Sequence, residues 1–360
     1  MLTNTSLDFL ERLLNTSGPS GFEEEAAKVY RREAETFADK VYTDVMGNTM
    51  AVINPDAPFK IMLAGHYDEI GFQVVYISEE GLLYIRSVGG IDKHTIPGLD
   101  VNVLTNKGLV PGSIGRKPIH LQTPKERETA SEIHDLWVDI GAENREEAAK
   151  MVAIGDPVSF KPNYRRAGEN RIFSKGMDDK IGAFAVLEAL RLLSVARPSS
   201  KVGVYAVGTV QEELGTRGAK TGTFGIAPNA GICVDVGFAT DIPGVDKKQW
   251  GDVKLGSGPI VSRNADTNPV LLKKALAAAE KNSIPFQMAC GHRATGGTDT
   301  ATMQLSGAGV ATCLFSIPNR YMHTPVELCD LRDVENTSRL IAETIASLTG
   351  EEQFRPGVDE

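Results

Sequence analysis

Four apolar segments dominate the pattern of this chain and restrict the folds open to it. Near-continuous runs of Val, Ile, Leu and Ala are typical of strands that are buried on both faces of a sheet. Helical patterns alternate with these runs, so the sequence predicts an α/β domain whose sheet is covered on both faces. The predicted strands are KIMLAG (60–65), KVGVYAVGTV (201–210), GICVDV (231–236) and VATCLFSI (310–317).

Three helices are expected between and after these strands. The segment DDKIGAFAVLEALRLL (178–193) is apolar almost all round, which is typical of a buried helix. Asn268-Pro269 opens a second helix, because Asn is a good N-cap and Pro fits the first turn. A last helix is expected over 332–349, ended by Gly350.

A different texture interrupts this pattern after the first strand. From about 69 to 161 the chain has short β-patterned runs with frequent Gly and Pro, as in GFQVVYISEEGLLYIRSVGG. Such runs are typical of a small barrel or sandwich, and one helix, NREEAAKM (144–151), is expected within it with Asn144 as N-cap. We therefore predict an α/β domain formed by 1–69 and 162–360, and an inserted β-rich domain formed by 70–161.

The overall composition excludes several classes of protein. The 360 residues have a net charge of −9, which argues against binding to nucleic acid or to an anionic membrane. No segment approaches the ~20 apolar residues of a membrane span, and the N-terminal MLTNTSLDFLERLLNTSG is patterned as an amphipathic helix rather than a signal peptide. The four cysteines show no C-x-x-C spacing, so reduced thiols and a cytoplasmic location are expected.

Ionisable residues gather just after the predicted strands. In an open α/β sheet the ligand site lies beyond the carboxyl ends of the strands, so these side chains are expected to meet. Singly, each has a structural explanation, such as a helix N-cap for one of the two aspartates at 178 and 179. The residues are His66, Asp68 and Glu69 after the first strand, Glu212 and Glu213 after the second, Asp235 in the third, His323 after the fourth, and Asp178 and Asp179 at the start of the buried helix.

Taken together, these residues predict a metal site. Several carboxylates buried side by side are costly unless cations neutralise them. Two histidines with carboxylates form a nitrogen and oxygen ligand set that suits zinc, cobalt or manganese better than calcium. The count fits two divalent cations, each with one histidine and one acid, and a bridging carboxylate, which is an arrangement used for hydrolysis.

The adjacent Glu212 and Glu213 are expected to have different tasks. On an extended chain neighbouring side chains point to different sides, so one glutamate can bind a cation while the other stays free beside the attacking water. A free carboxylate in that position is a general base. Asp68, two residues after His66, is close enough to hold the other nitrogen of that imidazole.

Six motifs are similar, in order and spacing, to those of metallopeptidase family 42. They are GHYDEIGF, GMDDKIG, VQEELGTRGA, CVDVG, GGTDTATMQLSGAGVATC and NRYMHTP. This family comprises di-metal aminopeptidases of the glutamyl and leucyl type, including the tetrahedral (TET) peptidases. The resemblance covers nearly the whole chain and, as a combination of motifs, is specific.

The resemblance implies a role for each candidate residue. Glu212 would be the general base, and Asp68 would orient a histidine. Two divalent metal ions, zinc or cobalt or else manganese, would be held by five ligands: His66 and Asp235 for one ion, Glu213 and His323 for the other, and Asp178 as the bridge.

The resemblance also implies a fold, a substrate class and an assembly. The fold would be a zinc-exopeptidase-like α/β sandwich with a mixed, largely parallel sheet, interrupted by a small β-barrel-like domain used in dimerisation and assembly. The substrates would be peptides with a free N-terminus, and the chain would form a homododecamer built from dimers. Arg263, His292 and Arg293 could favour acidic N-terminal residues, and the loop 296–299 could shape the pocket. The preferred residue, the metal and the role of Glu69 stay open.

Three other activities are weighed against the sequence. A carboxypeptidase or N-deacylase of the same fold would use a similar site, and a carboxypeptidase would add an arginine for the substrate carboxylate, with Arg217, Arg263, Arg293 and Arg320 as candidates. A glycanase would use Glu212 and Glu213 as its acid pair. That activity needs carboxyls about 5–9.5 Å apart on opposite sides of a sugar, and it leaves both histidines unexplained.

Overall fold

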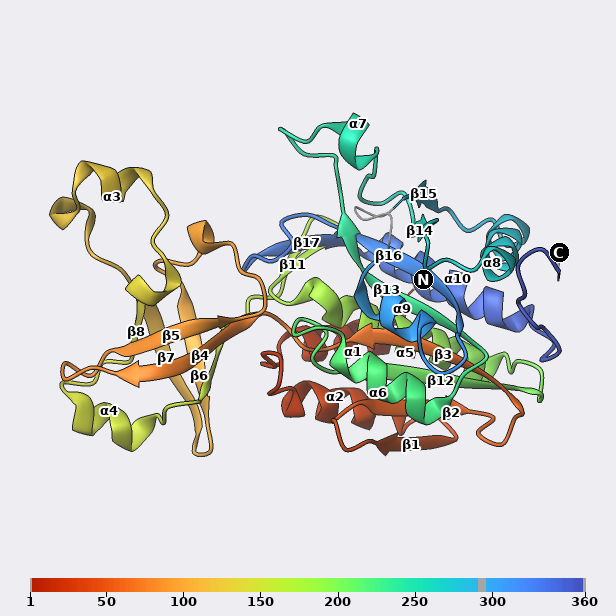
Figure 1. Cartoon of the computed structure of the whole chain (residues 1–360), viewed down its shortest axis with the longest axis horizontal. Coiled ribbons are helices and arrows are strands. Elements are labelled where there is room, and N and C mark those ends of the chain that lie inside the picture. The colour runs from red at the N-terminus through yellow and green to blue at the C-terminus, as the bar shows by residue number, and fades with distance from the viewer. Residues whose placement is uncertain (1, 291–295, 359–360) are drawn as a thin grey trace.

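An eight-stranded mixed sheet forms the centre of the larger part of the molecule (Figure 1). The computed structural model describes residues 2–290 and 296–358. The four central strands run parallel, and the neighbouring β2 and β14 are antiparallel to them. The order is β1 (Lys40–Thr43), β2 (Thr49–Ile53), β12 (Val202–Thr209), β3 (Phe59–His66), β13 (Ala230–Phe238), β16 (Ala311–Asn319), β14 (Ile260–Ser262) and β15 (Gln287–Ala289).

The four central strands are the four apolar segments of the sequence, so the predicted fold class is confirmed. Each strand begins and ends within two residues of its expected bounds. Nearly every residue of these strands is buried, because helices cover both faces of the sheet. The carboxyl ends of the parallel strands consequently lie along one edge, where a ligand site is expected.

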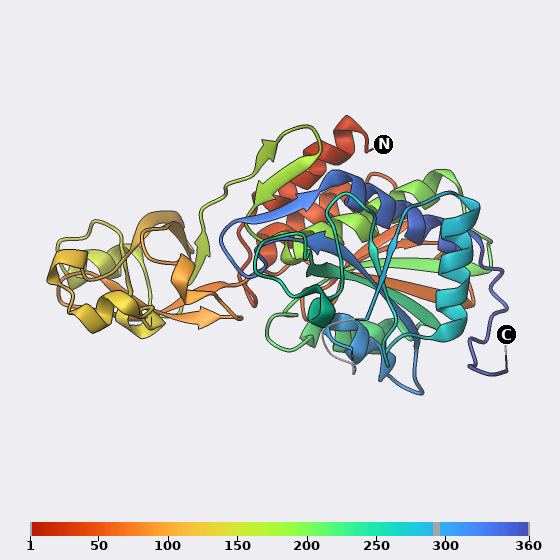
Figure 2. The same cartoon turned by 90° about the horizontal axis from the view of Figure 1, so that it is seen from above.

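Five helices cover one face of the sheet and two cover the other (Figures 1 and 2). The larger group includes the buried helix predicted at 178–193 and the helix capped by Asn268, whose side chain accepts from the N–H groups of Val270 and Leu271. This group comprises α1 (Asn4–Leu14), α2 (Glu24–Ala34), α5 (Met177–Val195), α8 (Pro269–Lys281) and α10 (Leu331–Ala346), and the other α6 (Arg217–Ile226) and α9 (Thr298–Gln304).

The last helix is shorter than expected. It ends at Ala346 rather than near residue 349, because the chain tightens there: the N–H of Leu348 donates to the carbonyl of Ile345, three residues earlier. Gly350 adopts a positive φ of 86° beyond this turn. A further short helix, α7 (Lys247–Trp250), stands away from the sheet.

The inserted segment forms a closed six-stranded barrel with its own apolar core (Figure 1). Figure 2 shows the barrel projecting from one end of the sandwich. All its strands lie inside the segment 70–161, while the use of this segment in assembly stays a prediction. The strands, in order around the barrel, are β4 (Gly71–Ile77), β5 (Leu83–Val88), β8 (Trp137–Asp139), β7 (Gly108–Gly115), β6 (Asp100–Thr105) and β9 (Pro157–Phe160).

Short elements complete the barrel and the junction with the sandwich. The predicted cap is present at α4 (Arg145–Met151), where the Asn144 side chain accepts from the N–H of Glu147. The barrel also carries α3 (Pro124–Glu128) and the 3-10 turns η1 (Lys93–Thr95), η2 (Ile119–Leu121) and η3 (Ile133–Asp135). Beside the sandwich, a three-stranded sheet is formed by β10 (Arg165–Ala167), β11 (Arg171–Ser174) and β17 (Glu327–Asp330).

Among residues 2–290 and 296–358, none of the helices combines the length and the apolar character that crossing a membrane requires.

Candidate metal centre

The ionisable residues of the strand ends meet at the carboxyl edge of the sheet. His66 is the last residue of β3, and Asp235 lies near the end of β13. Glu212 and Glu213 follow β12 in a turn, and His323 lies in the connection from β16 to β17. The first turn of α5 brings Asp178 to the same place.

Asp178 lies between the two imidazoles. Its Oδ1 is 3.2 Å from Nε2 of His66, and its Oδ2 is 3.2 Å from Nε2 of His323. Asp235 lies on the His66 side, with its Oδ1 4.0 Å from Nε2, and Glu213 lies on the His323 side, with its Oε1 3.6 Å from Nε2. The structure therefore brings together all five residues that the sequence predicts as ligands.

Donor atoms of Asp178, Glu213 and His323 lie within 4.8 Å of one another, as do donor atoms of a second group formed by His66, Asp179 and Asp235. Asp179 is not among the predicted ligands. Its Oδ2 accepts from the backbone N–H of His66 at 3.2 Å, and its Oδ1 accepts from the N–H of Gly182 at 3.1 Å. Since its backbone is not helical, Asp179 caps the regular part of α5, which is the structural alternative that the sequence left open for this pair of aspartates.

Glu212 and Glu213 point to different parts of the site, although the chain here is not extended. The prediction from sequence assumed an extended chain and was wrong on this point. The N–H groups of Gly215 and Thr216 both donate to the carbonyl of Glu212, so the pair lies in a turn. Glu212 Oε2 lies 3.9 Å from Nε2 of His66, whereas Glu213 faces His323.

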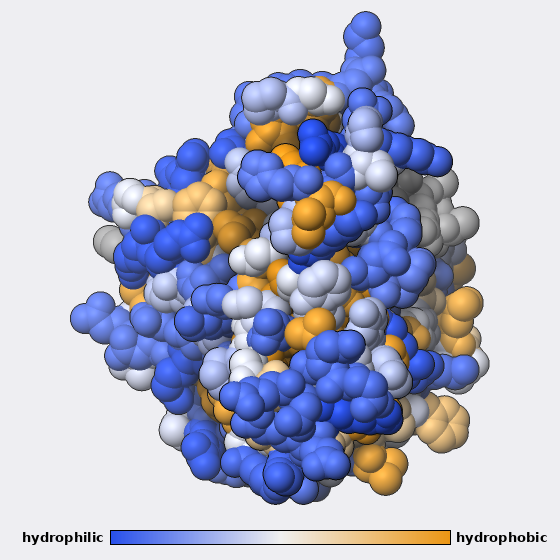
Figure 3. Space-filling model, turned by 90° about the vertical axis from the view of Figure 1, so that its left-hand side faces the viewer, coloured by the Kyte–Doolittle hydropathy of each residue, from blue (hydrophilic) through white to orange (hydrophobic). Residues whose placement is uncertain are grey.

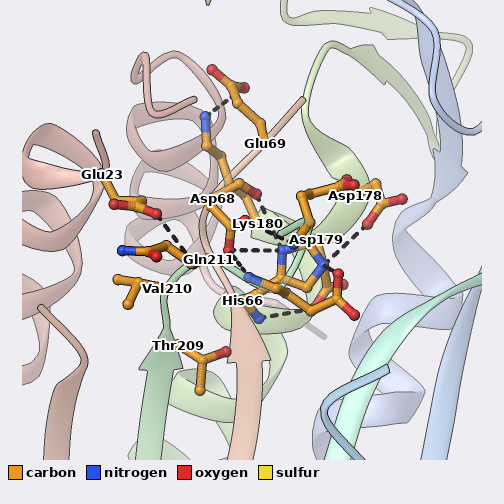
Figure 4. A network of polar contacts seen from close by, with 12 residues as sticks. Glu23, His66, Asp68, Glu69, Asp178, Asp179, Lys180, Thr209, Val210 and Gln211 are labelled. Carbon is orange, nitrogen blue, oxygen red and sulfur yellow. Dashed lines mark hydrogen bonds and ion pairs between the residues drawn. The ribbon is translucent and has the colours of Figure 1, made fainter. Parts of the chain in front are cut away.

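Asp68 contacts both His66 and the turn that carries the two glutamates. Its Oδ1 lies 3.4 Å from Nδ1 of His66, and that nitrogen is 3.2 Å from the Asp68 carbonyl oxygen. The Asp68 carboxylate also accepts from the backbone N–H groups of Glu212 and Glu213, at 3.0 and 3.1 Å. Figure 4 shows Asp68 beside His66.

The protonation of the site fits a centre that accepts cations. Burial, together with the charge of Asp178, raises the pKa of Glu213 to about 8 and that of Asp235 well above its usual value. Burial also raises the pKa of Glu212 to about 7. A hydrogen bond to Asp178 raises the pKa of His323 to about 10. Without cations, the carboxylates thus take up protons, which reduces the buried negative charge. The mixed nitrogen and oxygen donors suit a divalent transition metal.

The carboxylate of Glu327 supports the site through backbone hydrogen bonds and was not predicted from the sequence. Glu327, in β17, accepts from the backbone N–H of Asp178 at 3.1 Å and from that of His323 at 3.1 Å. It therefore fixes the two segments that meet at the centre. The signal in the sequence was an acid within the short apolar run VELCD, four residues after His323.

The barrel domain also reaches the site. The N–H of Asp92 donates to the carbonyl of His323 at 3.3 Å, and the His323 ring hydrogen-bonds to the backbone of Gly90. Gly89 lies against the site at a positive φ of 78°, where a Cβ would meet Cγ2 of Ile70 at 2.8 Å and Oε2 of Glu213 at 3.1 Å. The loop after β5 is thus part of the wall of the centre, which no pattern in the sequence indicates.

The Glu69 side chain is directed away from His66 (Figure 4) and lies in a buried ionic cluster. Its carboxylate accepts from Nζ of Lys175 at 2.7 Å and from Nζ of Lys180 at 2.8 Å. Gly18 N–H and Ser159 Oγ donate to the same carboxylate at 3.0 Å each. Glu69 lies where the chain leaves the sandwich for the barrel, and Ser159 lies in β9, the last strand before the chain returns. Their hydrogen bond therefore links the two chain segments that connect the domains.

Of the other candidate positions, Asp299 lies beside the site, whereas Arg263 follows β14, which runs antiparallel to β16 and away from its carboxyl end. Asp299, in the loop that could shape the pocket, is buried and accepts from Oγ1 of Thr209 at 2.6 Å. Arg263 is exposed, and His292 and Arg293 lie outside the described residues. Of the cysteines, all free, only the one at 290 is exposed.

A sandwich of this topology with two histidine–carboxylate groups at its carboxyl edge defines a class of α/β proteins suited to hydrolysis with divalent cations. The chain belongs to peptidase family M42, described as M42 glutamyl aminopeptidase, which matches residues 47–340. This confirms both the family predicted from the motifs and the enzyme class, since aminopeptidases are hydrolases.

Individual relatives match over almost the whole chain. The lysyl aminopeptidase of Pyrococcus furiosus is 36% identical over 341 residues, covering 92% of this chain and 94% of its own. The TET aminopeptidase of the marine sediment archaeon Thaumarchaeota archaeon SCGC AB-539-E09 is 34% identical, with a TM-score of 0.90 over 96% of this chain and 97% of its own. A chain of PhTET1-12s, whose structure holds a dodecamer, is 33% identical. Its TM-score is 0.84, over 95% of this chain and 99% of its own.

Proposed function

We propose that this chain is a metal-dependent aminopeptidase that removes N-terminal residues from peptides with a free N-terminus, with Glu212 as its general base. The main support is the position of Asp178, whose two oxygens each lie 3.2 Å from Nε2 of a different histidine. A carboxylate between two imidazoles can bridge two cations, and a two-cation centre is an arrangement for hydrolysis.

The proposed ligands divide into two halves around that bridge. His66 and Asp235 would hold one ion, and Glu213 and His323 would hold the other, which agrees with the pairing of their donor atoms. Glu212 would be left free to act as the base. Zinc or cobalt suits this donor set, and manganese is the third candidate.

When bound, the cations polarise the scissile carbonyl and lower the pKa of the attacking water, toward about 7 by analogy with zinc sites. Glu212 accepts the proton of this water at its carboxylate and delivers it to the leaving amine. Because Glu212 is largely buried beside the proposed ligands, its carboxylate is placed next to the space that the attacking water would occupy. Asp68 holds the Glu212 backbone while this proton moves.

Replacing Glu212 with Gln tests the assignment of the base. The amide keeps the size of the side chain but cannot accept the proton, so we expect turnover of an aminoacyl-p-nitroanilide to fall by at least about 100-fold, the range of general-base contributions. Two equivalents of metal should still bind, as measured by elemental analysis after dialysis. Substantial turnover by metal-loaded Glu212→Gln protein would refute this role.

A carboxypeptidase would need an arginine that is free to bind a terminal carboxylate. Arg320 is instead paired with Asp241, through Nε–Oδ1 at 3.0 Å and Nη2–Oδ2 at 2.7 Å. Arg217 is directed to Oε1 of Gln211. Test peptides blocked at either terminus separate the activities: an acetylated N-terminus should abolish cleavage, and an amidated C-terminus should not. The opposite result would favour a carboxypeptidase, and release of the acetyl group would favour an N-deacylase.

A glycanase is disfavoured by the surroundings of the two glutamates. Glu212 faces His66 and Glu213 faces His323, so each carboxyl is directed at a histidine of the same cluster, and neither histidine has a role in a glycanase. Any glycanase activity that survives a chelator would contradict this interpretation.

We further propose that the chain works in the cytoplasm as a homododecamer built from dimers. The dodecamer of its relative PhTET1-12s supports the stoichiometry. The identity of the preferred N-terminal residue is best determined with a panel of aminoacyl-p-nitroanilides, because the relatives carry both lysyl and glutamyl names.

A further inference from the structure

The turn that carries Glu212 and Glu213 is held by side chains from other segments. Four consecutive backbone N–H groups, from residues 210 to 213, each donate to a side-chain oxygen rather than to a neighbouring backbone. Val210 donates to Oδ1 of Asn48 at 3.1 Å, and the last two donate to Asp68 at 3.0 and 3.1 Å. The remaining donor, the N–H of Gln211, lies 3.1 Å from Oε1 of Glu23.

Glu23 comes from a distant part of the chain. It lies at the start of α2, outside the range 47–340 matched by the family, and only 6% of its surface is exposed. The same Oε1 accepts from the N–H of Gly21 at 2.6 Å, so the carboxylate is itself fixed by its own loop. Figure 4 shows Glu23 directed at Gln211, on the opposite side of the turn from the histidine.

The conformation of Gln211 explains why this contact matters. Its φ is 54°, a left-handed value that non-glycine residues adopt infrequently. This backbone reversal sends the chain from the end of β12 into the turn, so that Glu212 faces His66 while Glu213 faces His323. The acceptor supplied by Glu23 satisfies the N–H of the reversed residue, which would otherwise have to be desolvated without a partner.

We propose that Glu23 is a positioning residue of the catalytic centre, acting through the backbone of Gln211 to hold Glu212 and Glu213 in place. The inference rests on the proposed function of these two glutamates. Among the described residues, the Glu23 carboxylate accepts from the backbone N–H groups of Gly21 and Gln211 and not from a proposed ligand. Replacing Glu23 is therefore expected to weaken binding of the cation proposed for Glu213 and His323, and to slow proton transfer by Glu212. Substrate affinity is expected to stay unchanged.

A matched pair of variants isolates the acceptor atom. Glu23→Gln keeps a carbonyl oxygen at Oε1, and Glu23→Met has a similar size and no strong acceptor. Burial and the charge of Asp68 raise the pKa of Glu23 to about 7, so an uncharged amide is a close replacement. Glu24→Ala serves as a control, because Glu24 is the exposed neighbour in the same first turn.

The first measurement needs no turnover. Cobalt(II) alone is titrated into the full-length, chelator-treated protein by calorimetry, with the cobalt absorption spectrum recorded in parallel. We expect Glu23→Met to weaken one of the two binding steps by about 10–100-fold, the usual range for residues behind a metal ligand, and to leave the other step within about threefold. Glu23→Gln and Glu24→Ala should both resemble the wild type.

The second measurement separates kcat from KM at saturating metal. Glu23→Met should lower kcat by about 10-fold or more while KM stays within about threefold, because proton transfer is affected and substrate binding is not. Glu23→Gln should restore most of kcat. Melting of the metal-free proteins records any general loss of stability, which a purely structural role would produce without changing the binding step or kcat.

Two results would overturn the proposal: a Met variant that matches the Gln variant in the binding step and in kcat, or one that differs from it only in melting temperature. If the wild type binds two ions but cleaves no N-terminal residue, the proposed function fails, and the titration still decides the role of Glu23. If the wild type binds no cobalt at all, both proposals fall.

Discussion

The proposed ligands Glu213 and His323 would make metal binding depend on pH. In the absence of a cation, burial and the charge of Asp178 raise the pKa of Glu213 to about 8, and the hydrogen bond to Asp178 raises that of His323 to about 10. Both groups therefore hold a proton at pH 7 and must lose it to bind a metal. A cation at this half of the centre thus competes with protons.

The affinity for this cation should consequently rise with pH. Between pH 6 and pH 8 we expect an increase of up to about tenfold per pH unit for each proton displaced. Titration of cobalt(II) by calorimetry in buffers of different ionisation enthalpy would measure both the affinity and the protons released. Binding that is independent of pH over this range, with no proton release, would contradict the protonation described for these two residues.

The site residues that were predicted share one property, and those that were missed share another. His66, Asp235 and Asp178 could be predicted because each follows or lies in an apolar segment whose type is evident, and parallel strands share their carboxyl edge. Glu23 and Glu327 act on backbone N–H groups whose direction depends on loops. A left-handed residue or a turn leaves no periodic signal, so such contacts become evident only from the fold.

The packing of α5 on β3 depends on glycine. A Cβ at Gly65 would lie 2.5 Å from the backbone nitrogen of Ala183 and 2.5 Å from the carbonyl carbon of Gly182. Neither atom can rotate away, so a side chain at this position would push the buried helix from the strand. Both elements could be predicted from their apolar patterns, but no pattern in the sequence indicates how closely they approach each other.

Gly65→Ala should therefore destabilise the protein by at least about 1–3 kcal/mol, the usual cost of overpacking. Gly225→Ala is a matched control, because Gly225 lies in α6 and a Cβ added there would have nothing within 4 Å, and alanine is favoured over glycine in a helix by about 0.5–1 kcal/mol. Urea-unfolding midpoints of the two metal-free variants should thus move in opposite directions. A Gly65→Ala protein as stable as the wild type would contradict the close contact.

The cluster around Glu69 joins three segments that are far apart in the sequence. Lys175 and Lys180 flank the start of α5, and Ser159 ends the barrel. Burial opposes ionisation of Glu69, but the two ammonium groups lower its pKa to about 2. Since this is below the ordinary value of 4.5, its contribution to stability is present above about pH 4.5 and is lost as the pH falls toward 2.

Glu69→Gln should leave the two ammonium groups buried without their counter-charge. Breaking a buried pair in this way costs about 3–5 kcal/mol, which chemical unfolding of the metal-free protein near pH 7 would measure. The exposed pair between Glu25 and Lys28 provides the control, because Glu25→Gln should change stability by less than about 1 kcal/mol. Equal effects of the two substitutions would show that burial does not matter here.

The barrel has two relations to the rest of the molecule. Its loop after β5 contacts Glu213 and His323, so the segment 70–161 contributes to the wall of the centre. Its far end, which carries α3, projects away from the sandwich (Figure 1). Figure 3 shows apolar side chains among hydrophilic ones on the face that the barrel turns outward.

Two exposed apolar side chains lie in the turn just before α3. Ile119 and Leu121 are 59% and 67% exposed. Single exposed apolar residues are normal, but this pair is presented by an ordered turn: Gln122 accepts from Arg116 at 2.9 Å, and Lys117 donates to Glu126 at 3.1 Å. A fixed apolar pair on a projecting domain is the kind of surface that a second copy of the chain would cover.

The double substitution Ile119→Glu and Leu121→Glu should therefore break the proposed dodecamer into smaller species, since it would place two charges in each contact. Val45→Glu is the control, because Val45 is fully exposed on the sandwich, between β1 and β2, and its change should leave the assembly intact. Analytical ultracentrifugation would measure the size of each protein.

Turnover of a small aminoacyl-p-nitroanilide should persist in the dissociated variant, because the ends of β3, β12 and β13 and the start of α5 lie within one subunit. A dodecamer that survives the double substitution would exclude this turn from the assembly contacts. If the variant loses both the dodecamer and its turnover, assembly must hold the loop after β5 against the centre.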